Sequence, residues 1–141
     1  MDPRHLKRIK ISQNLFAASF PSLKDNLPYE NEPMTKDVLQ NLEQIDELIT
    51  KHAPKFPIDR IAKTDLAVLR LAVYELIVSP KEPSKVVINE AVELAKELGG
   101  DRSYAFINAV LGTIFKNLPE QQQKAAEEKP ADETPEQPSN G

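Results

Sequence analysis

The sequence of 141 residues contains no cysteine, which excludes disulfide bonds and thiolate chemistry and is typical of a reducing cytoplasm. It has no apolar stretch of the length that spans a bilayer. Its first residues interleave Leu6, Ile9 and Ile11 with charged side chains, where a signal peptide would need an apolar run. The sequence therefore predicts a soluble cytoplasmic protein, and 40% hydrophobic residues suffice for a single core.

Histidine and glycine are also scarce. His5 and His52 are the two histidines, and neither has a partner at metal-ligand spacing. The four glycines form no phosphate-binding loop. Acidic pairs within one helical turn, such as Glu90 and Glu93, are far more often a solvated face than a general acid and base. The sequence thus predicts no metal and no cofactor, and a protein that is not an enzyme.

Charge is divided unevenly along the chain, whose net charge is −4. The first ten residues, MDPRHLKRIK, hold four lysines and arginines and one aspartate. Residues 119–141 are acidic, carry four prolines and have alanine as their only apolar side chain, so we expect a disordered tail. Two interpretations of the basic segment compete: it binds nucleic acid, or it is a solvated helix face.

Apolar residues recur with helical spacing along the rest of the chain. Asp2 followed by Pro3 predicts a helix that starts there and runs to about Ser19. Prolines at positions 21, 28 and 33 predict a loop over 21–34. Further helices are expected at about 35–52, 64–79, 86–98 and 103–118, and KHAPKFPIDR (51–60) is interpreted as a broken connection with room for a short helical turn.

Three helix ends and one helix position are predicted in more detail. Thr35 is expected to cap the second helix, Gly99 to follow a helix end at the C′ position, and Asp101 or Ser103 to cap the last helix. The segment 64–79 is apolar around its whole circumference, so it should be central and buried. The fold class is therefore all-α, a compact helical bundle of about five helices.

Three blocks carry a resemblance to a known family. DLAVLRLAVYEL (65–76), PSKVVINEAVELAKELGG (83–100) and SYAFINAVL (103–111) occur in the order and spacing of the NusB family of bacterial transcription antitermination factors, which they resemble. ISQNLF is similar to the Gln-x-Leu-aromatic stretch of that family's first helix. The chain departs from the family pattern in lacking a helix between the first two and in having lysine at positions 7 and 10.

The resemblance implies a NusB-like domain over residues 1–118, built from two packed helical subdomains and followed by the tail, 119–141. It implies binding to the boxA sequence of nascent ribosomal RNA leader transcripts. It also implies two partners, the ribosomal protein NusE and the RNA polymerase elongation complex. The alternative is a helical interaction module that keeps the NusE contact and binds little RNA.

The candidate site residues follow from charge and helix position. The expected phosphate contacts lie on one helix, and all four together predict a slope of log K against log salt of roughly −3; they are Arg4, Lys7, Arg8 and Lys10. A second RNA-binding group is expected at the start of the last helix and comprises Arg102, Ser103 and Tyr104. There the free backbone N–H groups would bind a phosphate, and the tyrosine ring would stack on an unpaired base. For each group the alternative is a purely structural role.

Two acidic residues complete the predictions. Asp65 is expected to stabilise the start of the central helix, or to contact the NusE-like partner. Glu75 is interpreted as structural, paired with Arg70 or capping a neighbouring backbone group.

Overall fold

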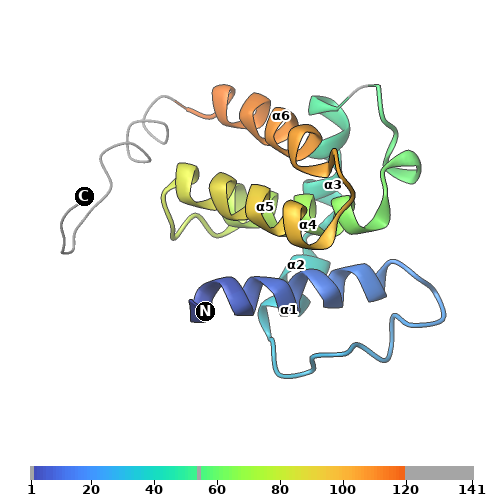
Figure 1. Ribbon diagram of the computed structural model, residues 1–141. Helices are drawn as coiled ribbons and strands as arrows, with labels where there is room; N and C mark the ends of the chain where they lie inside the picture. Colours follow the sequence, from blue (N-terminus) through green and yellow to red (C-terminus); the bar gives the residue numbers. More distant parts are fainter. Residues whose placement is uncertain (1, 54, 120–141) are drawn as a thin grey trace.

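The structure is a computed structural model that describes residues 2–53 and 55–119. All regular secondary structure in these two ranges is helical, so the all-α prediction is confirmed (Figure 1). The elements are α1 (Pro3–Ala18), α2 (Met34–Gln40), α3 (Leu42–His52), the 3-10 turn η1 (Ile58–Arg60), α4 (Lys63–Val73), the π-helical segment η2 (Tyr74–Val78), α5 (Ser84–Leu98) and α6 (Ser103–Lys116). The predicted disordered tail lies outside the described residues, apart from Pro119.

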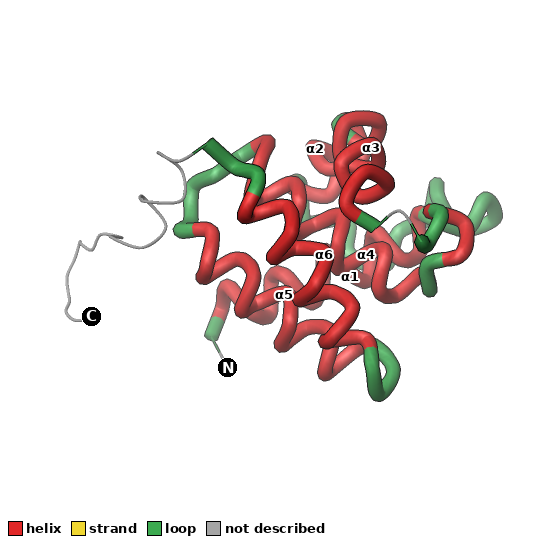
Figure 2. The backbone as a smooth tube through the Cα atoms, turned by 90° about the horizontal axis from the view of Figure 1, so that it is seen from above, coloured by secondary structure: helices red, strands yellow, loops and turns green. Residues whose placement is uncertain are grey.

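Helix α4 is the centre of the molecule, as its all-round apolar pattern predicts. It packs against α1, α3, α5 and α6, which surround it in both views (Figures 1 and 2). Every residue from Leu66 to Leu69 is at most 4% exposed. A helix that is apolar on all sides is stable only where neighbours cover all of it. No helix within the described ranges is long and apolar enough to cross a membrane.

Helix α1 begins and ends where its sequence predicts. The Asp2 carboxylate accepts a hydrogen bond from the Arg4 N–H at 2.8 Å, with Pro3 in the first turn. Its inner face buries Ile11 and Leu15 against α4. The segment that follows, 19–33, forms only isolated turns, so the predicted loop is confirmed.

The second predicted helix is interrupted, which the sequence interpretation did not anticipate. Asn41 has φ −111° and ψ 16°, and its side-chain amide donates to the Asp37 carbonyl at 2.7 Å. A local side-chain bond of this kind competes with the helical ladder and separates α2 from α3. Thr35 is not the N-cap, because α2 begins one residue earlier and Thr35 Oγ1 accepts from the Asn14 amide instead.

Gly99 ends α5 for a reason other than the predicted left-handed C′ conformation. Its φ of −100° and ψ of −170° are extended backbone that any residue adopts. A Cβ at this position would lie 2.5 Å from Ser103 Oγ and 2.9 Å from the Ala95 carbonyl oxygen. Glycine is therefore required for space, because α5 and α6 meet at a tight corner.

Candidate nucleic-acid interface

Helix α1 presents its basic side chains on two different faces. Arg4, Lys7 and Lys10 follow one another at spacings of three and form a stripe on the outside of the helix, here called the basic stripe. Arg4 and Lys7 are exposed, and Lys10 is half-buried. Arg8 lies about 200° around the axis from Lys10, at 3.6 residues per turn, and faces the core.

The structure assigns Arg8 to the interior, so the predicted phosphate contact of Arg8 has no support in this arrangement. The residue is 8% exposed. Its Nε and Nη2 donate to the two carboxylate oxygens of Glu75 at 2.9 and 2.8 Å, and Nη1 lies 3.5 Å from a carboxylate oxygen of Glu90. The hydrogen bonds to Glu75 raise the pKa of Arg8 above its ordinary value. The Arg8 guanidinium is therefore held by carboxylates of the protein itself.

Glu75 is structural, as predicted, but its predicted partner is wrong. Arg70 instead donates from Nε and Nη2 to the Asp46 carboxylate of α3 at 2.9 and 2.8 Å. Arg70 and Glu75 are five residues apart, across the junction of α4 and the π-helical segment, and so point to different sides of the axis. The central helix is thus tied to α3 by one residue and to α1 by the other.

A second set of ion pairs joins the start of α1 to α5 and the turn before it. The His5 Nδ1 contacts Glu90 at 2.9 Å and the Nε2 contacts Glu97. These hydrogen bonds, that to Glu90 first, raise the pKa of His5 above 6.5. Exposed Arg4 Nη1 lies 3.4 Å from Glu82. Much of the positive charge of MDPRHLKRIK therefore meets acidic side chains of the protein itself.

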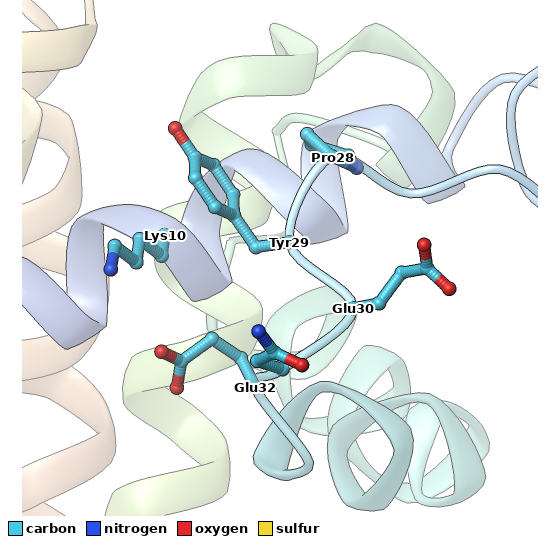
Figure 3. A pocket seen from close by; sticks show the side chains of 6 residues that line it. Lys10, Pro28, Tyr29, Glu30 and Glu32 are labelled. Atoms are coloured by element: carbon cyan, nitrogen blue, oxygen red, sulfur yellow. The ribbon is translucent and has the colours of Figure 1, made fainter.

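Lys10 borders a polar surface hollow of about 370 Å³ at the far end of the basic stripe (Figure 3). Its ammonium lies 5.8 Å from the centre of the Tyr29 ring, a cation–π distance. In Figure 3 the Glu30 side chain points away from Lys10, and Glu32 lies on the same side of the hollow as Lys10. No ion pair of Lys7 or Lys10 is found within 2–53 and 55–119.

The second predicted RNA group lies at the α5–α6 corner. Ser103 is buried and is not the N-cap, a position that Arg102 occupies without a side-chain cap bond. The Ser103 hydroxyl oxygen accepts from the Gly100 N–H at 2.9 Å. Tyr104 is 44% exposed, with the Lys96 ammonium 5.4 Å from its ring centre. The Tyr104 ring therefore lies at the surface beside a cation, whereas Ser103 shapes the corner.

These two groups remain separate in the structure. No hydrogen bond or ion pair in the described part of the chain joins the α5–α6 corner to Arg4, Lys7 or Lys10. Sequence reasoning also missed Tyr29 and Asn14. The available signal was Asn14, a polar residue on the buried stripe of α1, three residues after Ile11.

Asp65 lies in the first turn of α4, as its predicted dipole role requires. It is 9% exposed, and its buried Oδ1 has no hydrogen-bond partner within the described residues. Over the same residues, no cluster of three or more His, Cys, Asp or Glu side chains is arranged to hold a metal ion.

Comparison with known proteins places this arrangement in a family. Residues 19–116 match the model of the NusB family. The transcription antitermination protein NusB of Bacillus licheniformis is 36% identical over 126 residues, which cover 82% of this chain and 98% of the relative. That of Geotalea daltonii is 41% identical over 116 residues, 80% of this chain and 79% of the relative. The chain therefore belongs to the NusB family.

Solved structures agree. NusB of T. maritima superposes with a TM-score of 0.74 at 30% identity, over 86% of this chain and 97% of that one. A chain from a crystal structure of the antitermination factors NusB and NusE in complex with dsRNA shares the fold, with a TM-score of 0.67 at 23% identity over 82% and 99% of the two chains. NusB proteins are non-enzymatic antitermination factors, and membership of this family confirms the prediction that the chain is not an enzyme.

Proposed function

We propose that this protein binds the boxA sequence of nascent ribosomal RNA leader transcripts together with ribosomal protein NusE. The pair would then present the RNA to the elongating RNA polymerase and promote transcription of ribosomal RNA. Family membership and the NusB–NusE–dsRNA structure with the same fold support this proposal. The observation that carries it is the basic stripe, in which Lys7 and Lys10 have no carboxylate partner among the residues that the structure describes.

The stripe sets the expected salt dependence. Each lysine or arginine that neutralises a phosphate of single-stranded RNA contributes about −0.7 to the slope of log K against log salt. Three stripe residues therefore predict a slope of about −2. Participation of Arg102 would make it about −3. Arg8 contributes nothing to this sum, because Glu75 and Glu90 already hold its guanidinium.

The roles of the remaining candidates are also proposals. Tyr104, exposed beside Lys96, would stack on an unpaired base, and Arg102 would contact phosphate. Ser103 would act through the shape of the corner. Asp65 would contribute to the NusE contact through the first turn of α4, since little of its own side chain reaches the surface.

The test is fluorescence anisotropy of a labelled boxA RNA across a salt series, with and without NusE. We expect binding that strengthens with NusE and weakens with salt at the slope given above. Lys7→Gln together with Lys10→Gln should lower the magnitude of the slope by about 1.4. Lys51→Gln, which removes an exposed lysine in the last turn of α3, is the matched control and should change nothing. Absence of RNA binding with NusE present at low salt would refute the proposal.

A second function is favoured by the internal ion pairs. Arg4, His5 and Arg8 all contact carboxylates of the protein, which leaves few side chains for RNA. The protein would then be a helical interaction module that binds NusE and little RNA. Calorimetric titration with NusE in the absence of RNA separates the two cases. Heat of binding to NusE without any anisotropy change of RNA would establish the second.

A further inference from the structure

The loop between α1 and α2 is held in place by one buried amide. Asn14 is fully buried. Its Oδ1 accepts from the Tyr29 N–H at 2.8 Å, and its Nδ2 donates to the Tyr29 carbonyl at 2.8 Å and to Thr35 Oγ1 at 2.9 Å. A buried amide with all of these bonds made fixes both polar groups of the residue that it grips. The backbone N–H and carbonyl of Tyr29 are thus both held by a side chain of α1.

The anchored residue places its aromatic ring beside Lys10, in a hollow that Glu30 and Glu32 also line. Tyr29 is half-buried and forms a wall shared by two surface hollows of about 370 and 410 Å³. The Lys10 ammonium stands over the ring, so cation and π-face lie at the same end of the basic stripe (Figure 3).

These features match the chemistry of single-stranded RNA recognition. Proteins bind unpaired bases by stacking them on aromatic rings, next to cations that track the backbone. A lysine stem is flexible, and its ammonium can leave the ring face for a phosphate while a base takes its place. A fixed aromatic ring loses little conformational entropy when a base stacks on it.

We infer that Tyr29 is a base-stacking residue of the RNA site, with Lys10 as the cation that contacts the adjoining phosphate. This inference rests on the proposed RNA-binding function and adds a binding residue to it. The basic stripe leads along α1 from Arg4 to Lys10, and the Tyr29 ring lies beside its Lys10 end. The carboxylate of Glu32, beside Lys10 in Figure 3, is placed to accept a hydrogen bond from a base amino group.

The experiment compares four variants of the full chain by anisotropy of labelled single-stranded boxA RNA with NusE present. Tyr29→Leu keeps an apolar side chain of similar reach and removes the ring, and we expect Kd to rise about tenfold with an unchanged salt slope. Tyr29→Phe keeps the ring and should bind as the unaltered protein does. Lys10→Gln should weaken binding and reduce the slope by about 0.7. Leu23→Ala, an exposed residue of the same loop, is the control without effect.

A second readout reports the stack directly. RNA with 2-aminopurine at single positions should lose fluorescence on binding at one position, and Tyr29→Leu should restore it. Unaltered Kd in Tyr29→Leu, while the unaltered protein binds RNA in a salt-dependent way, overturns the stacking role and leaves the proposed function standing. Weakened NusE binding by Tyr29→Leu without RNA would assign the loop to protein contact and overturn the inference too. Absence of RNA binding by the unaltered protein would refute both the proposed function and the stacking role of Tyr29.

Discussion

Replacing Arg8 by methionine is the most informative single change, because this predicted RNA contact is buried and paired with Glu75. Its side chain is 9% exposed and that of Glu75 is 10% exposed, and two hydrogen bonds of 2.9 and 2.8 Å join them. Arg8→Met leaves the Glu75 carboxylate buried without its partner. Breaking a buried pair on one side costs about 3–5 kcal/mol. That is a large part of the roughly 5–15 kcal/mol that stabilises an ordinary domain.

The two halves of the pair should not be equivalent. Glu75→Leu leaves Arg8 with Glu90 at 3.5 Å, so its guanidinium keeps one partner and the cost should be smaller, about 2 kcal/mol. The double variant, Arg8→Met with Glu75→Leu, buries no lone charge and should recover most of the loss. The order of stability predicted is therefore double variant, then Glu75→Leu, then Arg8→Met as the least stable.

Urea unfolding followed by far-UV circular dichroism measures these differences, and the chain has no tryptophan to follow by fluorescence. A loss below about 1 kcal/mol in Arg8→Met would match an exposed ion pair and refute the reasoning. RNA anisotropy then tests whether Arg8 contributes to RNA binding. Arg8→Met, measured where it is still folded, should keep the salt slope of the unaltered protein. A slope of log K against log salt that is smaller in magnitude by about 0.7 would show that Arg8 contacts a phosphate.

Three further predictions concern other contacts. Hydrogen bonds to the two α5 carboxylates raise the pKa of His5, so they stabilise the fold fully below pH 6.5 and are lost as pH rises through the folded-state pKa. The urea midpoints of the unaltered protein and His5→Gln should therefore differ most below pH 6.5 and converge as the pH rises above the folded-state pKa. Gly99→Ala should cost about 1–3 kcal/mol in the same assay, because its Cβ meets Ser103, whereas Gly100→Ala, with no atom nearer than 3.9 Å, should be neutral. Asn14→Ala should speed hydrogen exchange across residues 20–33 while α4 keeps its protection, and equal exchange in both proteins would contradict the anchoring role.

Periodicity predicted the helices well, because each had to bury an apolar face. The all-round pattern of 64–79 identified the central helix, and Asp2 with Pro3 located the first helix start. The break at Asn41 was missed because it depends on one side-chain bond to Asp37, which competes locally with a helix that propensity alone would continue. Gly99 was assigned to the correct helix end for the wrong cause, since a clash with another helix cannot be inferred from sequence.

The site was predicted less completely than the fold. Charge clustering found the basic helix but could not sort its cations into inner and outer faces, because that depends on where Glu75 and Glu90 lie in the folded chain. Nor could spacing indicate Tyr29, which lies in a loop without a pattern. Its position depends on Asn14, fifteen residues earlier, and on packing that only the structure describes.

The family match covers residues 19–116, so it starts just after α1. Yet α1 supplies Ile11 and Leu15, at 0% and 1% exposure, to the core around α4, and it provides the counter-charge of Glu75. A fragment that starts at residue 19 would lack α1. It would expose the apolar side chains of α4 that α1 covers and would leave the Glu75 carboxylate without its partner Arg8. The one helix that the family model leaves out is therefore the helix that closes the core. Boundaries drawn from this match would separate α1 from the core that it helps to cover.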